Sequence, residues 1–216
     1  MIKSILKGTL LVLGLAALFL AGPVIYYFPR YNFRTVEKGV FYGSRQMGGQ
    51  ALESTIRKRG IRTVINLRGE NPDSDWYNEE AETCARLGTT LVNLGWSQGS
   101  LPEPTSLARF VEVVETGEGP FLAHCAGGTH RTGVAAAVYL LLKGASVETA
   151  RKQFRIGFND APIGELLDLY EQSDLPFRQW VLEVYPGLYA ARMEQKAAWR
   201  GMERQGFSLP LSSTVI

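Results

Sequence analysis

The chain has 216 residues, of which 45% are hydrophobic, and its formal net charge is +2. This length suits one compact domain with an appendage, and the hydrophobic share is too high for a disordered chain. Residues 1–38 carry five basic side chains and one acidic one, so the rest of the chain has a net charge of −2. Such a domain lacks the basic surface that tracks nucleic-acid phosphates, and we exclude nucleic acid as a partner.

The first feature along the chain is an uncharged segment, residues 8–28, which follows Lys3 and Lys7. As a helix with a rise of about 1.5 Å per residue, it would cross a hydrocarbon core of roughly 30 Å. Aromatic residues at its end are typical of an interfacial anchor, whereas a cleaved signal peptide and a buried core helix are the alternatives. We therefore predict a single-pass transmembrane helix over residues 1–30.

The basic residues on the two sides of this segment give opposing indications of its orientation. Lys3 and Lys7 favour a cytoplasmic N-terminus, while Arg30, Arg34 and Lys38 on the other flank favour the reverse. N-terminal segments of the export type usually send the following domain across the membrane. We expect the domain to be periplasmic or otherwise extracytoplasmic.

Strands and helices alternate after this segment. Runs of β-branched and other apolar residues predict strands over residues 39–45, 63–67, 90–94 and 120–124. Longer segments closed by glycine or opened by a capping residue predict helices over 50–59, 75–87, 105–115, 132–143, 146–155, 164–172, 176–185 and 188–204. The alternation predicts an α/β fold with a central parallel or mixed sheet of four to five strands flanked by helices. The domain is expected over residues 31–185, followed by a C-terminal helix and loose tail over 186–216.

Both histidines and one of the two cysteines fall within the stretch HCAGGTHRTG, residues 124–133. A strand is predicted to end at His124 and a helix to begin at Thr132, so the loop between them directs backbone N–H groups and the positive end of a helix dipole towards one spot. The glycine pair lets the backbone curl around an anion, and the planar fork of Arg131 can bind two of its oxygens. The stretch therefore predicts a phosphate-binding loop.

Cys125 begins this loop, where amides and a guanidinium would lower its pKa and create a thiolate nucleophile. The other cysteine, Cys84, is predicted to be a helix residue without a role. Two cysteines so far apart, with no further histidine, do not predict a metal cage, and we expect no metal or cofactor. A disulfide between them is the alternative in an oxidising compartment, but the thiolate requires Cys125 to be free.

The pattern C-x5-R, with His124 before it and Thr132 after it, resembles the loop of the cysteine-dependent tyrosine and dual-specificity phosphatases. Its THRTG ending is similar to the atypical branch of plants, fungi and bacteria, which commonly reads KHRTG, and Thr129 replaces that lysine. The resemblance covers about residues 37–175. The N-terminal segment is also similar to that of bacterial periplasmic tyrosine phosphatases of this type.

The resemblance implies a dual-specificity phosphatase-like fold and hydrolysis of phosphate monoesters through a phosphocysteine intermediate, without a metal or cofactor. It implies that Cys125 is the nucleophile, that Arg131 clamps the phosphate, that His124 orders the loop and tunes the thiol, and that Thr132 helps the thiolate leave. The residues expected to contact the phosphate are Ala126, Gly127, Gly128, Thr129, His130 and Arg131.

Phosphatases of this family usually present an aspartic acid from a mobile loop upstream of the cysteine, to protonate the leaving oxygen. Here that loop reads WSQGSLPEP, and Gln98 stands where the acid is expected. Glu103 is its only carboxylate and is our candidate general acid; the alternative is a favourable charge at the start of the next helix. Asp160 is the second candidate. If neither serves, substrates with good leaving groups are favoured.

Arg68 and Arg45 fall at the C-terminal ends of predicted parallel strands, the edge where α/β active sites gather. Arg68 is a possible substrate or loop contact, and a surface ion pair with Glu70 or Asp73 is the alternative. The loop fits phosphotyrosine, phosphoserine or phosphothreonine proteins as partners, and also inositol phosphates and membrane phospholipids. A pseudophosphatase that only binds phosphate, which Gln98 favours, and a sulfur-transfer enzyme are the rival functions.

Overall fold

The structure is a computed structural model, and it describes Gly14 and residues 30–154 and 162–204. Its strands are β1 (Arg34–Glu37), β2 (Phe41–Arg45), β3 (Thr63–Asn66), β4 (Thr90–Asn93) and β5 (Phe121–Cys125). Its helices are α2 (Gly49–Arg59), α3 (Asp75–Leu87), α4 (Pro104–Thr116), α5 (His130–Leu142), α6 (Val147–Arg151), η1 (Pro162–Gly164), α7 (Glu165–Glu171), α8 (Phe177–Glu183) and α9 (Tyr185–Arg204).

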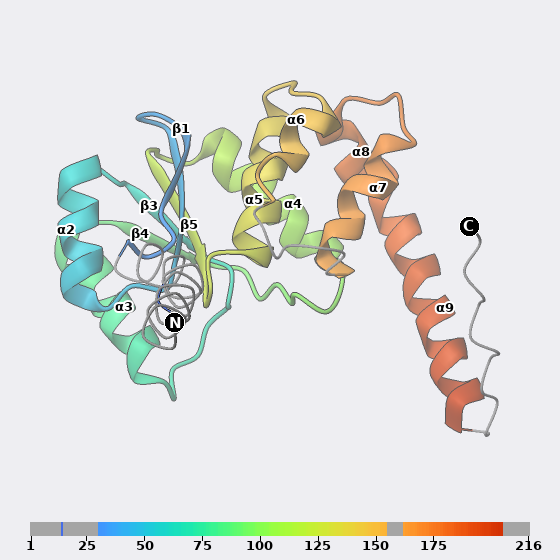
Figure 1. Cartoon of the computed structure of the whole chain (residues 1–216), viewed down its shortest axis with the longest axis horizontal. Helices are drawn as coiled ribbons and strands as arrows, with labels where there is room; N and C mark the ends of the chain where they lie inside the picture. The colour runs from blue at the N-terminus through green and yellow to red at the C-terminus, as the bar shows by residue number, and fades with distance from the viewer. Residues whose placement is uncertain (1–13, 15–29, 155–161, 205–216) are drawn as a thin grey trace, which may run out of the picture.

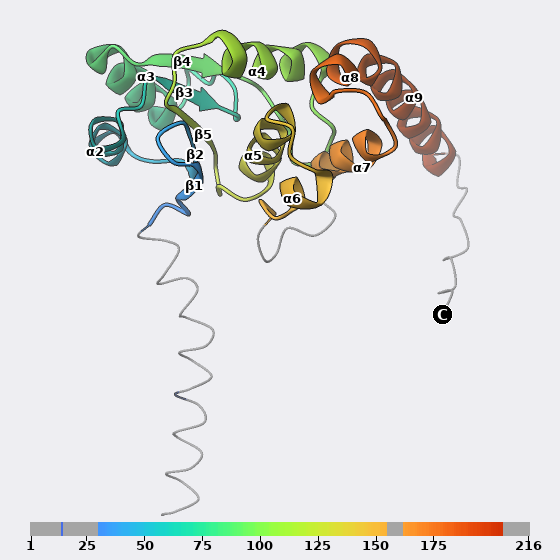
Figure 2. The same cartoon turned by 90° about the horizontal axis from the view of Figure 1, so that it is seen from above.

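In the described part of the chain, the strands form one five-stranded mixed sheet in the order β1-β2-β5-β3-β4. β5 is the central strand and runs parallel to β2 on one side and to β3 on the other, while β1 is antiparallel to β2. Helices α2 and α3 cover one face of the sheet, and α4 and α5 cover the other (Figures 1 and 2). The predicted α/β fold with a mixed sheet flanked by helices is confirmed.

Alternation along the strands divides the core in two. On β5, Leu122 packs with α2 and α3, whereas Phe121 and Ala123 face the larger cluster around α4 and α5. Successive side chains of a strand point to opposite faces, so His124 continues the α3 side and Cys125 the α5 side. This register decides the surroundings of the two residues that open the predicted phosphate loop.

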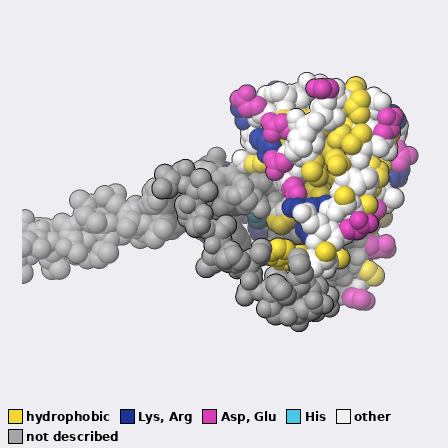
Figure 3. All heavy atoms as spheres, turned by 90° about the vertical axis from the view of Figure 1, so that its right-hand side faces the viewer, with side chains coloured by type: hydrophobic (Ala, Val, Ile, Leu, Met, Phe, Trp, Pro, Cys, Tyr) yellow, Lys and Arg dark blue, Asp and Glu magenta, His cyan; other side chains and the backbone are white. Residues whose placement is uncertain are grey.

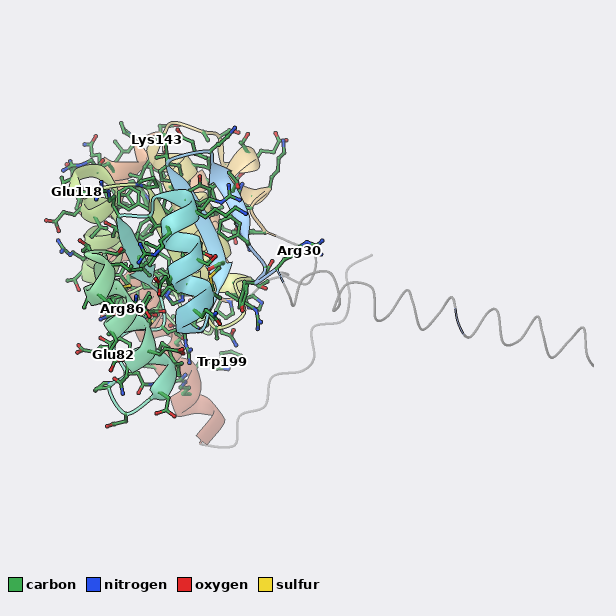
Figure 4. All side chains as sticks on the ribbon, turned by 90° about the vertical axis from the view of Figure 1, so that its left-hand side faces the viewer. Arg30, Glu82, Arg86, Glu118, Lys143 and Trp199 are labelled. Atoms are coloured by element: carbon green, nitrogen blue, oxygen red, sulfur yellow. The ribbon has the colours of Figure 1, made fainter. Side chains whose placement is uncertain are left out.

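Helix α5 is buried on nearly every side, which accounts for its uniformly apolar sequence. Tyr139 of this helix stacks on Phe41 of β2, with ring centroids 4.4 Å apart. On the opposite layer, polar residues join the helices at the surface, where Arg86 of α3 lies 2.8 Å from Glu53 of α2 (Figure 4). Because α5 is packed into the core, its first turn, where the candidate site lies, is held in a fixed position.

Several elements depart from the sequence prediction. Strand β1 was not predicted, because its residues RTVE do not form an apolar run, and the strand arises from pairing with β2. The short helix η1 was also missed. Helix α6 ends at Arg151 rather than near Arg155, and α9 begins at Tyr185, three residues earlier than expected.

No helix in the described ranges is long and apolar enough to cross a membrane. The predicted anchor over residues 1–30 lies outside these ranges, except for Gly14 and Arg30, and so do Asp160 and the tail 205–216. Helices α8 and α9 lie at the right-hand end of Figure 1, the end that faces the viewer in Figure 3. In the described part of the chain, Leu182 of α8 and Trp199 of α9 are the exposed large hydrophobic residues.

Candidate active site

The predicted phosphate loop lies at the carboxyl edge of the sheet, between the end of β5 and the start of α5. Neighbouring strands fix its entry from both sides. The N–H of Gln46, after β2, donates to the carbonyl of Cys125 at 2.7 Å, and the N–H of Leu67, after β3, donates to the carbonyl of His124 at 2.9 Å. The strand-loop-helix arrangement expected from the sequence is present.

The Cys125 thiol is buried at the base of the loop and accepts two hydrogen bonds. The N–H of Gly128 and the hydroxyl of Thr132 each lie 3.2 Å from its Sγ. Burial raises the pKa of Cys125, but hydrogen bonds from Thr132 and Gly128 and the charge of Arg131 outweigh burial and hold the pKa below its ordinary value. The site therefore favours a thiolate.

The guanidinium of Arg131 binds backbone carbonyls through one nitrogen and leaves another nitrogen available. Its Nη1 donates to the carbonyls of Trp96 at 3.2 Å and Leu67 at 3.4 Å. Its Nε is buried and has no hydrogen-bond partner among the described residues. A buried N–H left in this way is a strong donor for an anion, so the guanidinium is fixed on one side and available on the other.

The two loop glycines have different physical roles. Gly128 has a φ of +67°, and a Cβ placed there would lie 2.5 Å from the N of Arg45 and 2.7 Å from the carbonyl carbon of Ser44. At Gly127 an added Cβ would meet no atom within 4 Å. The expected need for glycine in the turn thus applies to Gly128, where the loop passes against β2.

The outer side of the loop is held by residues that the sequence analysis missed. Asn32 donates from Nδ2 to the carbonyls of Gly127 and Gly128, each at 3.0 Å. Buried Arg34 of β1 donates from Nη2 to the same Gly128 carbonyl. These contacts hold the carbonyl side of the loop, while the N–H of Gly128 donates to the sulfur of Cys125. No local sequence pattern predicts that Asn32 and Arg34 hold the loop, because their role depends on the pairing of β1.

A buried polar group lies behind His124, on the α3 side of the sheet. His124 Nε2 is 2.9 Å from Oε2 of Glu80, and both side chains are almost fully buried. The same Glu80 oxygen accepts a hydrogen bond from Nε2 of Gln46 at 2.6 Å. Glu80 was missed, although it shares the buried face of α3 with Tyr77 and Cys84. A carboxylate on that otherwise apolar face of α3 is the signal by which Glu80 could have been found.

Arg68 lies next to this group. Its Nη1 donates to Oε1 of Gln46 at 3.2 Å, and its guanidinium lies 3.4 Å from the centroid of the Trp76 ring. Burial and the nearby charge of Arg131 lower the pKa of Arg68. The surface ion pair considered from the sequence is absent, since Arg68 forms no ion pair with Glu70, Asp73 or any other described residue.

Of the two candidate general acids, the structure describes Glu103. Glu103 is exposed and caps the start of α4, where its Oε2 accepts hydrogen bonds from the hydroxyl of Thr105 and the N–H of Ser106. These hydrogen bonds lower the pKa of Glu103, which works against proton donation. Gln98 is exposed, and its main-chain carbonyl accepts a hydrogen bond from the N–H of Ile163 at 3.4 Å. Asp160 lies outside the described residues.

Cys84 and Cys125 are both free thiols. Cys84 lies in a helix, α3, as predicted. It is buried there, and burial together with the Glu80 charge raises its pKa to about 12. Among the described residues, no cluster of histidine, cysteine and acidic side chains has the arrangement of a metal site.

Three features together define the class of cysteine-dependent phosphatases. They are a thiol at the end of a central parallel strand, a loop N–H that donates to that thiol, and an arginine six residues after the cysteine. The chain belongs to the family described as "DSP-PTPase phosphatase fused to NAD+ Kinase", whose profile matches residues 37–163. Residues 37–163 thus correspond to a domain of the tyrosine and dual-specificity phosphatase type.

Receptor-type tyrosine-protein phosphatase V of Rattus norvegicus is 36% identical over 93 residues, which cover 37% of this chain and 5% of that protein. Tyrosine-protein phosphatase cdc-14 of Caenorhabditis elegans is 26% identical over 86 residues, which cover 40% of this chain and 11% of that protein. The chain thus spans only a small part of the length of these curated relatives.

Among solved structures, TpbA of P. aeruginosa is similar with a TM-score of 0.53 and 19% identity, over 72% of this chain and 93% of that one. TpbA has also been solved in complex with pTyr. At this level of identity the likeness shows the fold.

Proposed function

We propose that the chain hydrolyses phosphate monoesters, phosphotyrosine foremost, through a phosphocysteine intermediate on Cys125. The carrying observation is the buried thiol whose pKa is lowered by hydrogen bonds and by Arg131, below a guanidinium whose Nε has no partner in the described chain. The pTyr bound to TpbA supports the choice of substrate. Phosphoserine and phosphothreonine are the further substrates that the dual-specificity class allows.

In the first step the Cys125 thiolate attacks phosphorus, forming the S–P bond while the P–O bond to the leaving group breaks. The loop N–H groups and Arg131 bind the non-bridging oxygens and stabilise the charge that develops on them. In the second step water attacks phosphorus, the S–P bond breaks, and inorganic phosphate leaves. The Thr132 hydroxyl, 3.2 Å from Sγ, stabilises the departing thiolate.

Protonation of the leaving oxygen is the step that the described residues support least. Glu103 is engaged as a helix cap, and the capping hydrogen bonds lower its pKa and so favour the ionised form that cannot donate a proton. Glu103 and Asp160 remain the two candidate acids. Without an efficient acid, an aryl oxygen leaves more readily than an alkyl oxygen, since it is more stable as an anion. This reasoning also favours phosphotyrosine over phosphoserine.

We also propose that residues 1–30 anchor the protein in a membrane as a single-pass segment, with the domain outside the cytoplasm. The uncharged run of residues 8–28 supports the anchor, and Lys3 and Lys7 support the orientation. A reporter fused to the C-terminus and scored on each side of the membrane tests both parts. Reporter activity in the cytoplasm would contradict the orientation.

The test of the enzyme uses the full chain, purified in detergent, with p-nitrophenyl phosphate and a phosphotyrosine peptide. We expect vanadate-sensitive hydrolysis that Cys125→Ser abolishes and that the matched variant Cys84→Ser retains. Rapid quenching should give a phosphorylated protein that is labelled at Cys125. Binding of the peptide without turnover in the unsubstituted chain would instead favour a phosphate-binding module, the function to which Gln98 and the capping role of Glu103 point.

A further inference from the structure

Arg68 and Gln46 come from strands that are not neighbours in the sheet. Gln46 is the first residue after β2, Arg68 is the second residue after β3, and β5 lies between the two strands. Parallel strands lie about 4.8 Å apart, so the ends of β2 and β3 are separated by roughly 10 Å. Nevertheless, Arg68 Nη1 is 3.2 Å from Gln46 Oε1. The two side chains therefore meet across the end of β5, near enough to Cys125 for its charge to act on Arg68.

The guanidinium of Arg68 is held in this place before any ligand binds. The Trp76 ring lies against it, 3.4 Å from the centroid to the guanidinium carbon. Gln46 presents its oxygen to Arg68 because its Nε2 is bound by the buried Glu80 carboxylate at 2.6 Å. A cation fixed by an aromatic face and a hydrogen bond loses little side-chain entropy when it binds an anion.

The same guanidinium has unused binding capacity. Its Nε and Nη2 have no hydrogen-bond partner among the described residues, and no described carboxylate forms an ion pair with it. It is near enough to the Arg131 guanidinium for the two charges to repel. Two neighbouring cations without a directly paired carboxylate are unfavourable by themselves, and an anionic ligand relieves that repulsion.

We propose that Arg68 binds a second anionic group of the substrate, a carboxylate of the residue next to the phosphotyrosine. This inference rests on the proposed function, since the phosphate itself is placed on the Cys125 loop. The free Nε and Nη2 edge of a guanidinium matches the two oxygens of a carboxylate. The phosphate loop contains one arginine and no lysine, a charge too small to favour polyphosphorylated ligands over an acidic peptide.

The experiment compares two phosphotyrosine peptides that differ only in having glutamate or glutamine on both sides of the phosphotyrosine. With the full chain, we expect a preference for the glutamate peptide of about fivefold to tenfold in kcat/KM, expressed mainly in KM. Arg68→Gln should reduce this ratio to about one, whatever its effect on each peptide separately. Arg68→Lys keeps the charge without the planar fork and should retain part of the ratio.

The matched control is Arg109→Gln, which removes an arginine that pairs with Glu112 on the surface of α4. It should leave the peptide ratio at the wild-type value. Added salt should reduce the wild-type preference, because the contact is electrostatic and partly exposed. A structural role for Arg68 alone predicts equal losses for both peptides and an unchanged ratio.

Binding to the Cys125→Ser variant, alone and combined with Arg68→Gln, gives the same ratio without chemistry. If the wild type shows no turnover, the proposed function fails while the binding ratio still decides the role of Arg68. Equal binding of both peptides by the Cys125→Ser variant would overturn the second anionic position. So would a preference that persists in Arg68→Gln, because it would have to come from another residue.

Discussion

The two cysteines of the chain are almost equally buried, with exposed fractions of 1% for Cys84 and 3% for Cys125, but their environments act on them in opposite directions. In α3, burial and the charge of Glu80 raise the pKa of Cys84 to about 12. In the loop after β5, burial acts in the same sense on Cys125, but hydrogen bonds and the charge of Arg131 reverse it.

Burial alone therefore produces an inert thiol. The loop adds the hydrogen-bond donors and the positive charge that make a buried thiol reactive. The Thr132 hydroxyl lowers the pKa of Cys125 most, followed by the Thr132 N–H, the charge of Arg131 and the Gly128 N–H, and none of these acts on Cys84. They come from a turn and a helix start that the sequence places directly after the strand. The same residue type thus gains its function from the backbone that follows it.

The largest expected effect is selective alkylation of Cys125. At pH 7 a thiol with a pKa of about 12 is ionised in roughly one molecule in 10⁵, whereas a thiol with a lowered pKa is ionised far more often. We expect iodoacetamide to modify Cys125 at least about 100-fold faster than Cys84, after allowing for the lower nucleophilicity of the less basic thiolate. Mass spectrometry of quenched peptides measures both rates.

Vanadate should protect Cys125 in the same experiment and leave the slow reaction of Cys84 unchanged. Modification of the two thiols at similar rates would contradict the difference in pKa. Denatured protein is the reference, because there both thiols should react at nearly the same rate.

The next effect concerns the shape of the loop. Gly128→Ala forces a side chain into a φ of +67° and against the backbone of Ser44 and Arg45. We expect a loss of about 2 kcal/mol or more in the free energy of unfolding and the loss of the low thiol pKa. Gly127→Ala is the matched control, since its Cβ meets no atom, and its stability should stay within about 0.5 kcal/mol. Urea unfolding monitored by tryptophan fluorescence measures both.

A smaller effect is expected for Thr132→Val, which keeps the volume of the fully buried side chain and removes its hydrogen bond to Sγ. The thiolate loses that stabilisation, so the pKa of Cys125 rises. Because activity requires the thiolate, the acidic limb of the kcat/KM profile should move to higher pH by about one unit. A profile that falls at the same pH as in the wild type would show that Thr132 acts elsewhere, for example on the carbonyl of Ser44, which its hydroxyl also approaches at 3.2 Å.

The loop and the elements on either side of it could be predicted from the sequence because their signals are local. Glycines end α2 and α3 in the left-handed conformation, and the apolar run before Cys125 gave β5. The roles of Asn32 and Arg34 could not be predicted. Their side chains reach residues more than 90 positions away, and they do so only because β1 pairs with β2.

Glu80 lies between these two cases. Its position on the buried face of α3 follows from helical spacing, so a charged residue there could be recognised as unusual. Its partners His124 and Gln46 could not be recognised, because one lies in β5 and the other follows β2, both far from α3 in the sequence. Helical periodicity therefore identifies Glu80 as a buried carboxylate, while its binding partners become known only from the tertiary structure.

The smallest expected effect is that of Glu103→Gln, which extends the comparison of ionisable groups from the two thiols to the candidate acid. The capping hydrogen bonds hold the pKa of Glu103 below its ordinary value, so the carboxylate contributes stability above the pKa of the unfolded chain and loses it as pH falls through the folded-state pKa. At pH 7 we expect Glu103→Gln to lower the free energy of unfolding by up to about 1 kcal/mol, by weakening the cap of α4. The difference from the wild type should shrink under acidic conditions, as thermal unfolding at several pH values would show. If capping is the main role of this side chain, kcat for p-nitrophenyl phosphate changes little, whereas a fall of about 100-fold with loss of the basic limb of the pH profile would identify Glu103 as the proton donor.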